Sequence, residues 1–254
     1  MLRVSIFIFA AYLLQVSPLR AAELSLAVAS NFTGPMKELA TEFEKQSGHQ
    51  LQIAYGSSGK FFAQIVNGAP FQVFLSADQE KPIRLELKSL AVPGSRFTYA
   101  VGSLVLWSSR DNYLADGPAR LLEGNFHRLA LANPRLAPYG RAAEQALQKL
   151  GMAEQSRSRW VVGENIAQAF QFAYSGNADL GLIAASQLQT PAMNSQGSGW
   201  LVPANLHDPI LQDAVLLERG ETEPAARQFL AFLRSAEAAA IIRSHGYQRQ
   251  RDNM

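Results

Sequence analysis

Short stretches of alternating apolar and polar residues recur along the first third of the chain, each followed by a polar turn and an amphipathic stretch. Alternation with a period of two predicts a strand, and apolar residues three or four positions apart predict a helix. The paired strands and helices are expected at 23–29 and 32–46, at 51–55 and 60–66, and at 73–76 and 79–88. Three such units in succession indicate a parallel sheet covered by helices.

Small polar residues stand where these strands meet their helices. Ser30 and Asn31 follow the first strand, and Gly56-Ser-Ser-Gly59 follows the second. Because ligands of such sheets bind at the carboxyl ends of the strands, Ser30 and Ser58 map to one functional edge. The first turn of a helix has free N–H groups and a positive potential, so this edge predicts an anion site that needs no cation. The simpler interpretation makes these residues helix caps and a solvated turn.

The middle of the chain predicts a second set of strands and helices after a long apolar run. The run from Phe97 to Trp107 contains Gly102 and is long enough to cross between two lobes. Further strands are expected at 129–133, 159–163, 179–184 and 200–203, with helices at 141–150 and 166–174. Ile210–Leu217 predicts a return crossing before terminal helices at 224–234 and 236–244.

Composition excludes several functional classes. The chain has 254 residues, 48% of them hydrophobic, which is enough for a large buried core. A formal net charge of +2 gives no reason to expect a nucleic-acid partner. The absence of cysteine excludes disulfides, thiolate metal sites and cysteine catalysis.

The N-terminus is typical of a secretory signal peptide. Arg3 precedes an apolar run from Val4 to Val16, Pro18 breaks that run, and Ala21-Ala22 supplies the small residues of a cleavage site. We therefore expect residues 1–22 to be a signal peptide and the exported protein to start near Ala22 or Glu23. The alternative is an uncleaved anchor, for which the run is short.

Six segments, taken together and in order, match one known family. They are AVASNFTGPM at 27–36, YGSSG at 55–59, GAPFQVFLSAD at 68–78, NP at 133–134 with PYG at 138–140, GEN at 163–165 and SHGY at 244–247. This set resembles the periplasmic molybdate-binding proteins of bacterial ABC importers and covers nearly the whole exported chain. The run at 68–78 is the most specific piece, although Gln72 stands where the family usually has Asp.

The resemblance implies an α/β fold of the type II periplasmic-binding class. Two lobes are expected, each a mixed, mostly parallel sheet flanked by helices, joined by crossing strands. By position, lobe 1 would comprise residues 23–102 and 206–254, and lobe 2 residues 103–205. The ligand would lie in the cleft between the lobes.

The resemblance also implies the ligand-contacting residues. They are Ser30, Ser58, Tyr139 and Ile166, the last two mainly through their backbone N–H groups, with Asn31 as a further donor. One position departs from the family, because many members have a tyrosine where this chain has Ala184. A donor is then missing, and Asn31 is expected to replace it. Lys60 is also unusual beside a site that is expected to contain no charges, and the sequence does not show whether it contacts the anion.

The chemistry of these residues suits molybdate. Molybdate is a tetrahedral dianion whose oxygens only accept hydrogen bonds, and the predicted groups are donors. Several bonds of about 1.5–3 kcal/mol each reach sub-micromolar affinity after the costs of association. Phosphate would be rejected because its proton needs an acceptor. Tungstate should bind too, and a binding protein for sulfate or another tetrahedral oxyanion is the nearest alternative.

An enzyme is not expected. Gly56-Ser-Ser-Gly-Lys60 lacks the spacing of a nucleotide phosphate loop, and no Gly-x-Ser-x-Gly motif of a serine hydrolase is present. Asp78 and Glu164 are isolated carboxylates, which does not suit a cation site. The sequence thus predicts a monomeric periplasmic protein without a cofactor, which delivers molybdate or tungstate to the permease and ATPase subunits of an ABC importer.

Overall fold

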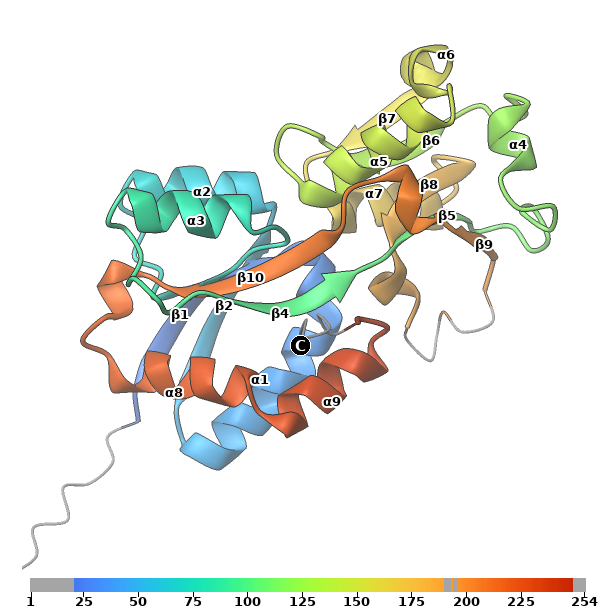
Figure 1. Ribbon diagram of the computed structural model, residues 1–254. Helices are drawn as coiled ribbons and strands as arrows, with labels where there is room; N and C mark the ends of the chain where they lie inside the picture. The colour runs from blue at the N-terminus through green and yellow to red at the C-terminus, as the bar shows by residue number, and fades with distance from the viewer. Residues whose placement is uncertain (1–20, 190–192, 194–195, 249–254) are drawn as a thin grey trace, which may run out of the picture.

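Two five-stranded sheets, each covered by helices, make up the computed structural model (Figure 1). The structure describes residues 21–189, 193 and 196–248. Most of the predicted signal peptide, residues 1–20, therefore lies outside the described residues. None of the helices among the described residues is long and apolar enough to cross a bilayer.

The first sheet has the strand order β2-β1-β3-β10-β4 and defines what we call lobe 1. Its strands are β1 (Glu23–Ala29), β2 (Gln50–Gly56), β3 (Val73–Leu75), β4 (Phe97–Gly102) and β10 (Ile210–Leu216). The first three strands are parallel, as the three repeated units predict, whereas β10 pairs antiparallel with both β3 and β4.

Both faces of this sheet are buried. Its helices are α1 (Thr33–Ser47), α2 (Ser58–Val66), α3 (Glu80–Leu87), α8 (Pro224–Leu233) and α9 (Ala236–Ser244). Because successive strand residues face opposite sides, Leu24, Leu26 and Val28 of β1 pack in the core under α1, α8 and α9. Ala27 instead packs in the core formed with α2 and α3, two helices that lie together on one side of the sheet (Figure 1).

The second sheet has the strand order β7-β6-β8-β5-β9 and defines lobe 2. Its strands are β5 (Leu104–Ser108), β6 (Leu129–Ala132), β7 (Trp160–Gly163), β8 (Leu180–Ala184) and β9 (Ser198–Leu201). Strand β6 is parallel to β7 and β8, and β5 is antiparallel to β8 and β9. The helices α4 (Ala119–Leu122), α5 (Pro138–Lys149), α6 (Ala153–Ser156) and α7 (Ile166–Tyr174) surround this sheet.

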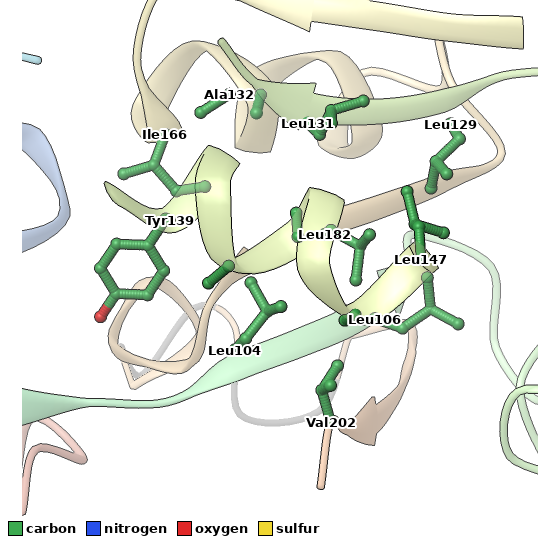
Figure 2. Close-up of a cluster of buried hydrophobic side chains, with 14 of the residues drawn as sticks. Leu104, Leu106, Leu129, Leu131, Ala132, Tyr139, Leu147, Ile166, Leu182 and Val202 are labelled. Carbon is green, nitrogen blue, oxygen red and sulfur yellow. The ribbon is translucent and has the colours of Figure 1, made fainter. Parts of the chain in front are cut away.

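Helix α5 fills one face of the second sheet. Figure 2 shows that Tyr139 and Ile166 lie at one end of the cluster that contains Leu104, Leu106, Leu129 and Leu131. The first residues of α5 and α7 are therefore fixed in position by the same core.

The chain passes from one sheet to the other twice. The predicted crossing run divides at Ser103, where β4 of the first sheet gives way to β5 of the second. The return follows β9 and leads into β10. Five short 3-10 segments complete the described elements: η1 (Ser30–Phe32), η2 (Arg157–Arg159), η3 (Ala185–Leu188), η4 (Ala204–Leu206) and η5 (Glu218–Gly220).

Candidate functional site

The five residues predicted to contact the ligand come together around one small cavity between the lobes. In the described part of the chain, the cavity is lined by Ala29, Ser30, Asn31, Gly56, Ser57, Ser58, Ala77, Ala137, Pro138, Tyr139, Asn165 and Ile166. The first seven belong to lobe 1 and the other five to lobe 2. The volume open to the centre of a water-sized sphere is about 10 Å³, so the cavity suits one compact ion rather than an extended molecule.

Ser58 is the first residue of α2 and is completely buried, with 1% of its surface exposed. Its Oγ accepts a hydrogen bond from the N–H of Ala77 at 2.9 Å. A serine hydroxyl has one proton and two lone pairs, so this bond leaves the proton free. Since Ser58 lines the cavity, its hydroxyl is placed to donate to an acceptor there.

Ser30 begins η1 directly after β1. The side chains of Ser30 and Asn31 do not cap a helix, because neither η1 nor α1 has a side-chain cap. No hydrogen-bond partner for Ser30 Oγ is found among the described residues, although Ser30 is buried, with 6% of its surface exposed. The simpler interpretation of Ser30 as an N-cap is therefore not supported, and its hydroxyl is also available in the cavity.

The N-termini of α5 and α7 reach the cavity from lobe 2. Asn165 caps α7 and accepts from the N–H groups of Ala167 and Gln168 at 3.0 and 3.1 Å. The N–H of Ile166 keeps no partner in the described chain, and neither does that of Tyr139 in the first turn of α5. Both N–H groups lie at positive helix ends, so backbone donors are available where the sequence predicts them.

The side chain of Asn31 is directed away from the role expected of it. Its amide nitrogen donates to Gln212 Oε1 and to Tyr247 Oη, both at 2.8 Å. These two bonds use both amide protons. Asn31 therefore lines the cavity, but both of its amide N–H donors are already hydrogen-bonded to other side chains of the protein.

A buried polar network lies behind Asn31, and sequence reasoning missed most of its members. Tyr247 Oη lies 2.8 Å from the Asn31 carbonyl oxygen and 3.0 Å from Ser186 Oγ, and Ser186 Oγ donates to the same carbonyl at 3.0 Å. Gln212 donates to Tyr139 Oη at 3.3 Å. Burial raises the pKa of Tyr247 to about 12 and that of Tyr139 well above its usual value, so both hydroxyls stay protonated.

This network explains two sequence features. Ala184 ends β8 and is buried in the lobe 2 core, and it does not line the cavity. Lobe 2 instead contributes Ser186, two residues later, to the polar network. Gly102 is required because a Cβ there would overlap Tyr139 Oη and lie 2.7 Å from Gln212 Nε2. Tyr247 belongs to the motif SHGY, whereas no motif pointed to Gln212 or Ser186.

Charged residues surround the cavity without entering it. Lys60 Nζ lies 3.0 Å from Glu164 Oε1 of the other lobe. Arg141 of lobe 2 pairs with Glu80 at 2.8 Å and with Asp78 at 3.5 Å, both of lobe 1. The hydrogen bond from Arg141 lowers the pKa of Glu80. Asp78 also accepts from the N–H of Lys81 at the start of α3.

The cavity offers donors and almost no acceptors. All the lining residues in the described chain are uncharged, and the side-chain oxygen Oδ1 of Asn165 already accepts from two N–H groups. An ammonium ion or a metal cation would find no carboxylate here. A compact, fully deprotonated anion would find the hydroxyls of Ser30 and Ser58 and the N–H groups of Tyr139 and Ile166.

Comparisons with known proteins agree with this geometry. A family model described as "Bacterial extracellular solute-binding protein" matches residues 24–248. A molybdate-binding protein of Azotobacter vinelandii is 49% identical over 228 residues, which is 90% of this chain and 90% of the relative. A molybdate-binding protein of Rhodobacter capsulatus is 46% identical over 230 residues, covering 91% of this chain and 90% of the relative.

A solved structure is similar as well. The periplasmic molybdate-binding protein of Azotobacter vinelandii superimposes with a TM-score of 0.85 at 42% identity, covering 89% of this chain and 99% of that one. The two-lobed architecture expected from the sequence is thereby confirmed.

Proposed function

This chain belongs to the bacterial extracellular solute-binding proteins, and from that premise we propose that it captures molybdate, or tungstate, in the cavity between its lobes. The family is one of solute-binding proteins rather than enzymes. The observation that carries the proposal is the lining itself: neutral donors from both lobes around a cavity for one compact ion.

The arrangement favours a dianion that carries no proton. Each bond from a hydroxyl or N–H group to a charged oxygen contributes about 1.5–3 kcal/mol. A protonated oxygen would be held less well, because the described lining residues include no carboxylate to accept its proton. A hydrogen phosphate ion would therefore bind more weakly than a fully deprotonated tetrahedral ion.

The context of the protein follows from its family. We propose a periplasmic protein, like the similar molybdate-binding protein of solved structure, that delivers its ligand to the permease and ATPase subunits of an ABC importer. The proposal includes a signal peptide over residues 1–22 and a monomeric exported protein. The lobe limits are proposed at 23–102 with 206–254, and at 103–205, in line with the crossing at Ser103. No resident cofactor is part of the proposal.

A panel of oxyanions tests the proposal. The unfolding temperature of the exported chain is measured in the presence of molybdate, tungstate, sulfate or phosphate. Titration calorimetry on separate samples gives the affinity for each ion. We expect molybdate and tungstate to raise the unfolding temperature, because a ligand that binds only the folded state stabilises it. At 100 times its dissociation constant, a ligand contributes about 2.7 kcal/mol. Sulfate should bind more weakly and phosphate least.

The alternative is a binding protein for sulfate, whose charge and shape are the same. An affinity for sulfate above that for molybdate would select this alternative. Binding of none of the four ions would contradict the proposal altogether.

A further inference from the structure

A direct contact between the lobes lies beside the cavity, at the second residue of α2. The N–H of Gly59 donates to the carbonyl oxygen of Leu136 at 2.8 Å. Gly59 follows Ser58 in lobe 1, and Leu136 stands two residues before α5 in lobe 2. This one bond therefore joins the helix ends that carry Ser58 and Tyr139.

The contact leaves no space for a side chain at position 59. A Cβ built on Gly59 would lie 2.7 Å from Leu136 O and 2.9 Å from Leu136 Cα. Both distances are shorter than real Cβ atoms tolerate, and both neighbours are backbone atoms, which cannot rotate away. With a side chain at position 59, the two lobes could meet here only if one lobe shifted against the other.

The helix itself does not require glycine at this position. Among the described residues, the glycines with positive φ do not include Gly59, so its backbone conformation is open to any residue. Alanine is favoured over glycine inside a helix by about 1 kcal/mol. Helix α2 by itself would therefore be more stable with alanine at position 59. Only the close approach of Leu136 from the other lobe requires glycine there.

We propose that Gly59 is a positioning residue for ligand capture, which lets the lobes close by admitting Leu136 to the start of α2. The inference rests on the proposed function, since it assigns the residue that controls closure around the oxyanion. The ion pair between Lys60 and Glu164, which also joins the lobes, contributes less to closure. The side chains of Lys60 and Glu164 are 51% and 46% exposed, and pairs so exposed contribute little.

The test compares Gly59→Ala with wild type and with Gly34→Ala. Gly34 is the matched control because it is the second residue of α1, in the same lobe, and a Cβ there meets only the His245 side chain of that lobe, at 3.3 Å. Calorimetry measures molybdate affinity, and small-angle scattering measures the radius of gyration with and without molybdate. Thermal unfolding of the ligand-free proteins checks that each variant is folded.

We expect Gly59→Ala to bind molybdate roughly 5- to 150-fold more weakly, the usual range for coupling between a conformational change and binding. Its ligand-free unfolding temperature should equal or exceed that of wild type. Molybdate should reduce the radius of gyration of wild type and Gly34→Ala more than that of Gly59→Ala. Equal affinity and equal contraction in all three proteins would overturn the inference.

A measurement on wild type decides the matter if Gly59→Ala fails to fold. Hydrogen exchange of the Gly59 amide, followed by nuclear magnetic resonance, should slow when molybdate is added, because the amide is hydrogen-bonded only when the lobes meet. An exchange rate that molybdate leaves unchanged would overturn the role of Gly59. A wild-type protein that binds no oxyanion would overturn the proposed function itself, and that result is distinct from tight binding with an unaffected variant.

Discussion

Ser57 and Ser58 are neighbours with different tasks. The side chain of Ser57 caps α2 by accepting from the N–H of Lys60, whereas Ser58 accepts from the N–H of Ala77 and keeps its proton for the cavity. A hydroxyl whose lone pair is held by the protein has its proton oriented before the ligand arrives. In the proposed complex, Ser58 would therefore donate with little further loss of rotational freedom.

Replacing Ser58 by alanine tests this assignment. We expect Ser58→Ala to lower molybdate affinity roughly 10- to 150-fold, the equivalent of one charge-assisted hydrogen bond of about 1.5–3 kcal/mol. The variant should also lose some stability because the N–H of Ala77 is left without a partner. Calorimetry measures the first effect and denaturant unfolding the second.

Ser235→Ala is the control for this variant. Ser235 caps α9 through its bond from the N–H of Ala238 and lies outside the cavity, so its loss should lower stability without changing affinity. If Ser58→Ala bound molybdate as tightly as Ser235→Ala does, Ser58 would not be a ligand donor.

At the scale of elements, the N-terminus of α7 is prepared for an anion by its own cap. Asn165 holds the N–H groups of Ala167 and Gln168 and leaves that of Ile166 free. A cap that took all the donors would leave nothing for a ligand. A neutral cap also leaves the positive end of the helix without a counter-charge.

A charged cap should separate helix stability from ligand binding. We expect Asn165→Asp to keep the stability of α7, since Asp caps a helix as well as Asn and suits its dipole. The same carboxylate would line the cavity and repel a dianion, so molybdate affinity should fall by about tenfold or more. Unfolding curves and calorimetry measure the two quantities.

Ser235→Asp places the same charge on the cap of α9, away from the cavity, and should leave the affinity unchanged. Tight molybdate binding by Asn165→Asp would show that the end of α7 does not face the ligand.

How far the sequence predicts these elements depends on their length. Strands such as β1 and helices such as α1 span several periods, so the change from period two to period 3.6 is plain. The four-residue helices α4 and α6 span one turn and carry no periodicity, and the sequence reading omits both. Helix α5 begins at Pro138, three residues before the predicted start. The prediction placed the start too late because Pro138 and Gly140 are typical of a turn. Proline is, however, also tolerated in the first turn of a helix.

The site is predictable to a similar degree. Ser30 and Ser58 could be placed because Ser30 directly follows β1 and Ser58 begins the helix after β2, so both lie at the carboxyl ends of parallel strands. The use of the Asn31 amide could not, because it is decided by Gln212 and Tyr247, which lie 181 and 216 residues away in the chain. Such partners are visible only when the fold is complete.

At the scale of the whole molecule, the buried network of Asn31, Gln212, Tyr247 and Ser186 joins both lobes at the crossing strands. Ser186 belongs to lobe 2, and its bonds to the Asn31 carbonyl and to Tyr247 span the boundary. A closed network of satisfied polar groups fixes one arrangement of the lobes better than an apolar contact would. Tyr247 is its centre.

The titration of Tyr247 gives stability a dependence on pH. Burial raises its pKa from 10.0 to about 12, so the folded protein holds a proton that the unfolded chain has lost above pH 10. The contribution is complete below pH 10 and is lost as pH rises toward 12, at about 1.4 kcal/mol per pH unit. The free energy of unfolding should therefore decline over this window.

Tyr247→Phe should be less stable than wild type at neutral pH and should lose stability less steeply above pH 10. Denaturant unfolding across this window measures both slopes. Tyr139 and Tyr99 also have raised pKa values from burial, so a residual slope is expected in the variant. Identical slopes in the two proteins would contradict the shift assigned to Tyr247.

The donors of the cavity are divided between two bodies, with the serine hydroxyls on one side and the helix ends of Tyr139 and Ile166 on the other. Neither half can surround an ion, and no ionisable side chain needs to change its charge for the ion to leave. In the proposed mechanism, opening of the lobes would therefore be enough to release the ion. A partner that binds both lobes and separates them would break some of the hydrogen bonds to the ion and admit water to the cavity, so release would need no change of charge in the protein.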